Sequence, residues 1–354
     1  MSTTTLKKGA RTNISIWMVI LVIFVVLGIA AWIFQLTQGL SSTGINQAVV
    51  WGIYIGTFFL LAGTASGFLF LASLGNLVFI PGLDKYRPGL LIGAVCTYIA
   101  AGIIILMDIG HPERVYQFLT SPQFNSPFVW DFYALALGTI AALAFLFLNP
   151  KEKWMGWIAG IVSLVVVVAE GLLLSVTGSR PLWDSALTPV VFVVEAVITS
   201  IAFLYVAISD EKVNQWLASV LRVFLPILLV LTFVEVITVM VGGEANAKEA
   251  MRLLLTGNLA LLFWGQIAVG IVLPMVIFAL KGSGRILTIS AAILAILGIL
   301  VAKLNLLVAG QAYPMFEKPI FYSPSWVEIS AVIGVVAFAI LLFALGRRVF
   351  PSKV

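Results

Sequence analysis

The sequence predicts an all-α integral membrane protein that crosses the bilayer about ten times. Of its 354 residues, 62% are hydrophobic and only 10% are charged, whereas about 25% of residues are charged in a soluble domain. One soluble core cannot bury so much apolar surface, so the solvent around the protein must be lipid. The net charge of +5 is then best explained by basic cytoplasmic loops, and we expect no nucleic-acid partner.

Ten apolar spans follow one another along the chain, each near or above the ~20 residues that cross the hydrocarbon layer. Their approximate bounds are 16–36, 50–80, 89–109, 129–149, 155–177, 189–208, 217–241, 259–281, 286–309 and 326–346. The first is longer than the apolar core of a signal peptide and no A-x-A cleavage site follows it, so we predict an anchor helix. The connections are short and polar, and none resembles a domain linker. Residues 1–354 therefore form a single integral membrane domain.

Basic residues are distributed unevenly between the two ends of these spans. Fourteen lysines and arginines lie on the side of the termini, five lie on the opposite side, and Lys303 lies within a span. Because the more basic side is normally cytoplasmic, both termini are predicted to be cytoplasmic, which agrees with an even number of spans. The longer loops, at about 37–49, 110–128, 178–188, 242–258 and 310–325, then lie on the outer side.

Cysteine and histidine are too scarce for the familiar metal cofactors. The chain has one cysteine, Cys96, and one histidine, His111. This excludes an intrachain disulfide, an iron–sulfur cluster bound by cysteines of this chain, and a haem held by two of its histidines. We therefore expect no haem, metal or iron–sulfur cluster to be bound by this chain.

Ionisable side chains gather in the outer half of the predicted spans. Asp108 ends the third span, Asp131 opens the fourth, and four more lie within about two turns of the outer end of later spans: Glu170, Glu195, Glu235 and Lys303. Each costs at least ~2.5 kcal/mol in hydrocarbon, so each needs a partner, a wet cavity or a function. Two interpretations stay open. The groups are structural pairs and interfacial side chains, such as Lys303 with a neighbouring glutamate, or they line a polar cavity that handles protons or a polar head group.

Two outer loops carry further candidate residues. One contains Asp108-Ile-Gly-His-Pro-Glu-Arg114 followed by Ser126-Pro-Phe-Val-Trp-Asp131, and the other contains Ser179-Arg-Pro-Leu-Trp-Asp184. His111 places a titratable group at the interface, but from composition alone a solvated histidine and an Arg–Trp anchor at the head groups are the favoured explanations of these residues.

These motifs resemble those of the NrfD/PsrC family, the membrane subunits of polysulfide-reductase-like complexes and of alternative complex III. The matching segments run in order along nearly the whole chain: Gln35-Leu-Thr-Gln-Gly39, Thr43-Gly44, Trp51-Gly-Ile-Tyr-Ile55, Gly63-Thr-Ala-Ser-Gly67, Asp108–Arg114, Ser126–Trp130, Arg180-Pro-Leu-Trp183, Thr188–Phe192, Leu255-Thr-Gly-Asn258, Phe263-Trp264, Ala309-Gly-Gln311, Tyr322-Ser-Pro324 and Glu328. No single segment is specific, but their order makes the resemblance strong. Some members have an Asn and a His on the first helix of the bundle, where residues 55–59 here offer only Thr57.

The resemblance implies two four-helix bundles with flanking helices: a first bundle at about 50–177 with the quinone site and a second at about 189–309. It implies a membrane component of a respiratory oxidoreductase in the prokaryotic cytoplasmic membrane, which binds a quinone, usually menaquinone. Electrons would be exchanged with a ferredoxin-like iron–sulfur subunit on the outer face, and beyond it with a molybdopterin catalytic subunit or a multihaem cytochrome c.

Within that scheme each candidate residue receives an expected role. The expected catalytic, proton-handling groups are Glu170 and Asp131; the expected quinone-binding residues are Asp108, His111, Arg114, Trp130 and Arg180; and the expected proton path contains Glu195, Glu235 and Lys303. Carboxylates are absent from the inner half of the spans, which favours proton chemistry near the outer face. A secondary transporter and a purely structural membrane anchor stay as alternatives, although a transporter would favour ionisable groups near the midplane.

Overall fold

The computed structural model describes residues 16–148, 152–280, 282–311 and 322–350, and within them the chain forms helices joined by turns, with no strand. Ten helical spans in this part of the chain are long and apolar enough to cross a membrane, which confirms the predicted fold class. They are α1 (Ile16–Gln38), α2 (Ile53–Leu77), α3 (Arg87–Asp108), α5 (Pro127–Leu148), α6 (Lys153–Ser175), α7 (Thr188–Ala207), α8 (Glu211–Gly242), the run of α10 (Ala260–Gly265), η4 (Gln266–Val272) and α11 (Leu273–Ala279), α12 (Arg285–Gln311) and α13 (Trp326–Val349).

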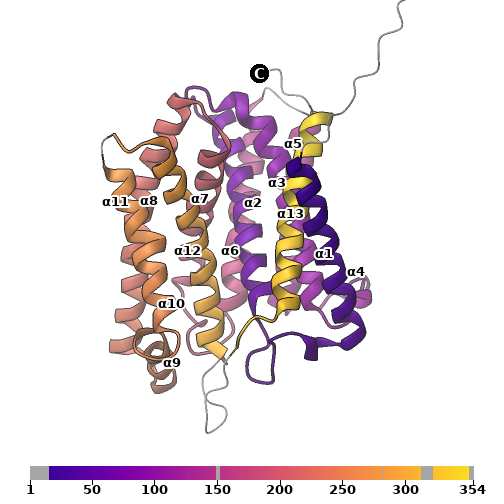
Figure 1. Cartoon of the computed structure of the whole chain (residues 1–354), viewed down its shortest axis with the longest axis vertical. Helices are drawn as coiled ribbons and strands as arrows, with labels where there is room; N and C mark the ends of the chain where they lie inside the picture. The colour runs from indigo at the N-terminus through magenta and orange to yellow at the C-terminus, as the bar shows by residue number, and fades with distance from the viewer. Residues whose placement is uncertain (1–15, 149–151, 281, 312–321, 351–354) are drawn as a thin grey trace, which may run out of the picture.

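The spans run alternately up and down, as Figure 1 shows. We call the end that carries residues 39–52, 109–126, 176–187 and 243–259 the long-loop end. The opposite end, with residues 78–86, 208–210 and 282–284, is the short-loop end, where α1 begins and α13 ends. Short helices η1 (Leu40–Ser42), η3 (Pro112–Arg114), α4 (Gln117–Thr120) and α9 (Ala245–Leu255) lie in the long loops, and η2 (Asp84–Tyr86) lies in a short one.

The spans pack in two neighbouring groups. Helices α2, α3, α5 and α6 contact one another, and α7, α8, α12 and the α10–η4–α11 run do likewise, while α13 packs on α3 and α1 packs on α13 (Figure 1). We call these groups the first bundle and the second bundle. The placement of a quinone site in the first bundle stays a prediction.

Helix α2 lies at the centre of the molecule, because it contacts α3 and α6 of its own bundle and also α7, α12 and α13. Its small residues allow this. A Cβ added to Gly67 would overlap Ser200 and the Ala196 carbonyl of α7, and such close backbone approach is typical of membrane helices. At the periphery, Gly28 of α1 meets Gly334 of α13 in the same way.

Two elements differ from the predicted helices. The loop expected at 242–258 contains α9, whose buried face is formed by Ala247, Ala250, Met251 and Leu254. This spacing is that of an amphipathic surface helix, and its polar residues distinguish it from the membrane spans. The eighth span, expected as one regular helix at 259–281, is interrupted by the π-helix η4.

Candidate functional site

The long-loop end is held together by Gln311, the last residue of α12. Its Oε1 accepts hydrogen bonds from the backbone N–H groups of Val50 (2.9 Å) and Trp51 (3.0 Å), and its Nε2 donates to the Trp51 carbonyl (2.8 Å). Residues 46–52 form no helix, so this amide supplies partners that secondary structure does not supply.

Glu328 makes a second clamp at the same end. Its carboxylate accepts hydrogen bonds from the Gly44 N–H (2.6 Å), the Ser325 N–H (2.8 Å) and the Tyr322 hydroxyl (2.7 Å). The Tyr322 oxygen in turn accepts from the N–H of Ile53, in the first turn of α2 (2.8 Å). Burial and the neighbouring Glu328 raise the pKa of Tyr322 above its ordinary value, so the phenol stays a donor. Together with Gln311, these residues satisfy backbone groups just before and at the start of α2.

Aromatic and amide side chains complete this cap. The Trp51 ring stacks on Trp183 with centroids 4.9 Å apart, and Trp183 Nε1 donates to the Leu306 carbonyl of α12 (3.0 Å). On the other side, the Tyr54 hydroxyl donates to Gln35 (2.7 Å), whose Nε2 donates to the Met107 carbonyl (2.7 Å). Many of the residues in the family-like motifs, such as Trp51, Trp183 and Gln311, therefore position the start of α2.

The first bundle contains buried oxygens that have no hydrogen-bond partner among the described residues. Glu170 on α6 is fully buried and neither carboxylate oxygen has such a partner; the same holds for one oxygen each of Asp131 on α5, Asp108 on α3 and Thr57 on α2. Buried polar atoms are normally satisfied, so orphaned ones indicate a water or a ligand. These four residues lie in the half of their helices nearer the long-loop end, whereas a fifth such oxygen of the bundle, Asn76 Oδ1 of α2, lies near the short-loop end. Asp131 and Glu170 lie on α5 and α6, which pack against each other, and the two carboxyl groups interact electrostatically.

Lys303 of α12 is paired with a carboxylate of the second bundle. Its Nζ lies 2.6 Å from Glu195 Oε2 of α7, and both side chains are almost entirely buried. The ammonium also lies over the face of Phe192, in the arrangement of a cation–π contact. Lys303 thus pairs with a neighbouring glutamate, as one of the two interpretations expected.

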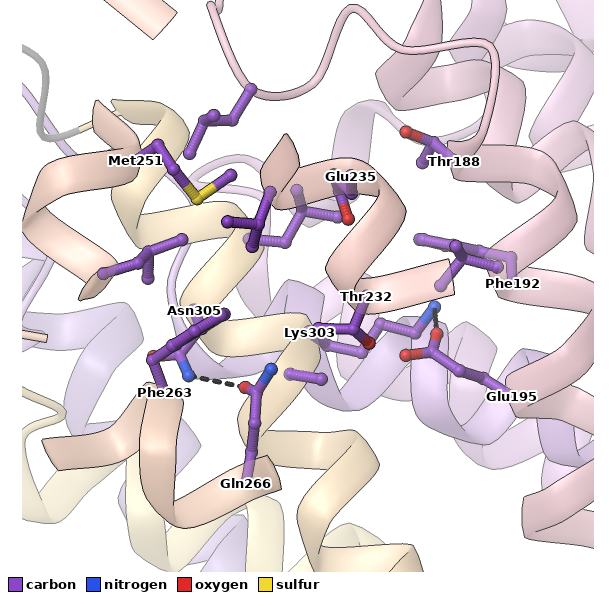
Figure 2. Close-up of a pocket in the computed structure, with 16 residues that line it drawn as sticks. Thr188, Phe192, Glu195, Thr232, Glu235, Met251, Phe263, Gln266, Lys303 and Asn305 are labelled. Carbon is purple, nitrogen blue, oxygen red and sulfur yellow. Dashed lines mark hydrogen bonds and ion pairs between the residues drawn. The ribbon is translucent and has the colours of Figure 1, made fainter. Parts of the chain in front are cut away.

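A cavity of about 60 Å³ adjoins this pair inside the second bundle. Figure 2 shows Lys303 directed at Glu195, with Thr232 and Glu235 of α8 also on the cavity wall. Elsewhere on the wall, Asn305 donates to Gln266 at the start of the π-helix (2.6 Å). Sequence reasoning missed this amide pair, although two amides inside otherwise apolar spans are a signal that could have identified it.

The other predicted quinone-binding residues lie at the surface of the long-loop end. His111 and Arg114 line a hollow of about 390 Å³ together with Phe118 and Phe128, and His111 Nδ1 lies 3.0 Å from Glu113, with both side chains exposed.

Two further members of that set have local partners instead. Exposed Trp130 donates from Nε1 to the Phe124 carbonyl (2.8 Å), and Arg180 lies 5.9 Å from the Trp183 ring centroid. The structure therefore brings Asp131 to Glu170 and brings Lys303 to Glu195, with Glu235 on the same cavity. It separates His111, Arg114, Trp130 and Arg180 from those interior groups.

Comparison with known proteins gives one family and several relatives. The family model described as "Polysulphide reductase, NrfD" matches residues 41–315. A chain of Halobacterium salinarum, provisionally named as a membrane subunit of dimethyl sulfoxide reductase, is 28% identical, with 95% of this chain and 91% of that one covered. A selenate reductase subunit of Mesobacillus selenatarsenatis is 23% identical, with 95% and 94% covered. The Hdr-like menaquinol oxidoreductase integral membrane subunit of Archaeoglobus fulgidus is 24% identical, with 97% and 95% covered.

The family match covers most of the chain, and it includes α2 to α12 with both bundles and the clamp residue Gln311. The relatives extend that similarity over nearly the full length. This multi-pass membrane protein therefore belongs to the polysulphide reductase NrfD family.

Proposed function

We propose that this chain is the quinone-reactive membrane subunit of a respiratory oxidoreductase complex, with menaquinol as the quinol. The main observation in support of this proposal is the group of buried, unpartnered oxygens in the first bundle. The names of the relatives support the same function, since one is a menaquinol oxidoreductase subunit and the other two are subunits of dimethyl sulfoxide and selenate reductases.

The chemistry of the unpartnered groups suits a quinol. Oxidation of a quinol releases two electrons and two protons, so its site needs hydrogen-bond partners for the ring oxygens and groups that accept protons. Glu170 and Asp131 are carboxylates with free acceptor capacity, and Thr57 adds a hydroxyl. In this proposal Glu170 and Asp131 hold the protons, Thr57 and Asp108 orient the ring, and the apolar α2 and α6 exclude water from it.

We further propose that an iron–sulfur subunit docks on the long-loop end and passes electrons on to a molybdopterin subunit or a multihaem cytochrome c. The long-loop end presents exposed His111, Arg114 and Arg252 within the longest connections. It is also the end nearest Glu170 and Asp131, which keeps the electron path short. If the basic-residue asymmetry sets the topology, this face lies outside the cytoplasm.

The test is quinol oxidation by the assembled complex with Glu170→Gln. Glutamine keeps the shape of the side chain and cannot accept the proton, so the turnover per assembled complex should fall by a factor of about 10² or more. Glu211→Gln is the matched control, because Glu211 is exposed at the short-loop end, away from the proposed docking face, and it should keep normal turnover.

The two alternatives give other outcomes. If Glu170 only stabilises the packing of the bundle, the Gln variant lowers the yield of complex while the surviving complex turns over at the normal rate. If the chain is a transporter, the purified complex does not bind quinone-site inhibitors. The Glu170→Gln variant then oxidises quinol no more slowly than the wild type. Either result would remove Glu170 from the proposed site.

A further inference from the structure

The Lys303–Glu195 ion pair forms a wall between two cavities. Phe192, Glu195 and Lys303 line the cavity of about 60 Å³ in the second bundle. The same three residues line a second cavity of about 10 Å³, on whose wall Glu170 of the first bundle also lies. The only buried lysine of the described spans therefore adjoins a carboxylate of each bundle.

The buried charges near Lys303 do not balance. Around this one ammonium lie Glu195 of α7, Glu170 of α6 and Glu235 of α8, and Asp131 of α5 interacts electrostatically with Glu170. An unpaired carboxylate in a dry interior is costly. Lys303 can therefore stabilise one ionised carboxylate at low cost, and the other adjoining it must hold a proton.

We propose that Lys303 is a two-position switch, which pairs either with Glu195 or with Glu170 and so moves a proton between the two bundles. In the position described here, Lys303 is bound to ionised Glu195 and Glu170 is the neutral acid. In the second position the O–H bond of Glu170 breaks, an O–H bond forms on Glu195, and the ammonium pairs with ionised Glu170. One proton crosses the bundle interface, and the total charge is unchanged.

The local packing leaves room for this exchange. The small cavity has about the volume that one water molecule needs, so a water can carry the proton between the carboxylates. Gly63 of α2 borders Glu170: a Cβ added there would lie 3.8 Å from Glu170 Oε2. Thr199 also lines the cavity, but its hydroxyl donates to carbonyls of its own helix, at Glu195 (2.9 Å) and Ala196 (3.2 Å).

Two aromatic rings, which contact each other, lie near the ammonium. The Phe192 ring lies beneath it now, and the Phe59 ring of α2, on the wall of the small cavity, has its centroid 5.9 Å away. Ring faces attract a cation without binding it in one place. The geometry thus supports a lysine that can change partners without exposure to lipid.

The switch gives the second bundle a part in the proposed quinol chemistry. A proton taken up by Glu170 would pass to Glu195 and reach the larger cavity, where Glu235 is the next carboxylate. The inference rests on the proposed function only in assigning the source of that proton. The exchange between Glu170 and Glu195 can be measured without any quinol.

The experiment is infrared spectroscopy of the purified complex at neutral pH, which detects the C=O stretch of protonated carboxyl groups. The band that Glu170→Gln removes from the wild-type spectrum is assigned to Glu170. In Glu195→Gln, Lys303 loses its partner and should transfer to Glu170, which becomes ionised, so the Glu170 band should disappear. In the double variant Glu195→Gln/Lys303→Met the band should return, because no ammonium remains to stabilise the ionised form.

A fixed ion pair gives the opposite result. If Lys303 cannot reach Glu170, Glu195→Gln leaves the Glu170 band unchanged, and the switch is refuted. Glu211→Gln, at the exposed short-loop end, is the control and should leave the band intact. Should Glu195→Gln fail to fold, Glu195→Asp decides: its shorter side chain weakens the present pair, so the Glu170 band should shrink, and an unchanged band would again refute the switch.

Quinol oxidation measured on the same samples separates the two proposals. Normal turnover in Glu170→Gln, combined with band loss in Glu195→Gln, would remove the quinol role and keep the switch. A large loss of turnover in Glu170→Gln with an unchanged band in Glu195→Gln would do the reverse.

Discussion

Gln311 organises a stretch of backbone that has no secondary structure of its own. Its single amide satisfies two N–H groups and one carbonyl of Val50 and Trp51, which lie about 260 positions earlier in the chain. Because residues 50 and 51 lie outside any helix, Gln311 supplies the hydrogen bonds that hold this loop in place.

Replacement of Gln311 by Leu should therefore destabilise the protein without altering its chemistry. The variant removes the part-buried hydrogen bonds from the N–H groups of Val50 and Trp51, at about 0.5–1.5 kcal/mol for each bond. We expect a lower thermal unfolding midpoint of the purified protein in detergent. Exposed Gln38 at the end of α1 provides the matched control: Gln38→Leu should leave the midpoint unchanged, and equal midpoints for both variants would contradict the clamp.

At this scale the sequence predicted where ionisable groups lie along the chain but not which of them meet. Counting residues from the helix ends placed Glu170, Glu195 and Lys303 at similar depth, and the helix positions agree. Whether Lys303 pairs with Glu195 or with Glu170 depends on the rotation of α12 against α6 and α7. That rotation is fixed by side-chain packing. Counting positions along the chain gives no information about such packing.

Among the helices of the described residues, α8 is the longest, with 32 residues, and it begins at a polar N-cap, Asp210. Asp210 accepts hydrogen bonds from the backbone N–H groups of Lys212 (3.0 Å) and Val213 (3.2 Å). It also forms an ion pair with Lys85 of η2, which ties the α7–α8 connection to the α2–α3 connection. The hydrogen bond from Lys85, followed by those from the backbone, lowers the pKa of Asp210.

The lowered pKa predicts how this contact depends on pH. A carboxylate with a depressed folded-state pKa stabilises the fold above its ordinary pKa of about 4, and the contribution is lost as the pH falls through the folded value. Asp210→Asn keeps a capping oxygen and loses the charge, so its unfolding midpoint should lie below that of the wild type at neutral pH. The two midpoints should converge in acid. Asp210→Ala, which also loses the cap, should be less stable than Asp210→Asn, and a difference between Asp210→Asn and the wild type that persists in acid would contradict the assignment.

The π-helix η4 shows what periodicity cannot reveal in an element. Residues 259–281 are apolar apart from Gln266 and the terminal Lys281, so a regular helix was the natural prediction. The interruption lies where Gly270 meets Gly298 of α12 at close backbone distance and where Gln266 binds Asn305. Both contacts depend on the partner helix, and π segments are often found at functional sites. By contrast, α9 has a clear amphipathic pattern that could have been recognised from its sequence.

For the molecule as a whole, the number of spans was predictable and their lateral arrangement was not. Apolar length alone identifies a membrane helix. Which helices lie side by side is harder to predict from the sequence. Lipid is as apolar as the helix surfaces, so there is no hydrophobic preference for burying one face of a helix. Small residues such as Gly63 and Gly67 mark the close approach of α2 to α7, but only the structure identifies that partner.

The topology can be tested with single cysteines, because the only natural one, Cys96, is buried. Gln123→Cys at the long-loop end and Lys212→Cys at the short-loop end are exposed positions. A membrane-impermeant thiol reagent added to intact cells should label the first and spare the second, since the short-loop end carries most of the basic residues. Labelling of Lys212→Cys with protection of Gln123→Cys would invert the proposed orientation and move the docking face to the cytoplasm.

The clamps formed by Gln311 and Glu328 also determine the stage of synthesis at which folding can be completed. A ribosome makes α2 long before it makes α12 and α13, yet the backbone at and before the start of α2 is bound by the side chains of residues 311, 322 and 328. The first bundle is thus inserted early and completed last. During synthesis the proposed quinol site stays unfinished until the tenth span arrives, so a truncated chain would carry its defect at the opposite end of the sequence from the missing residues.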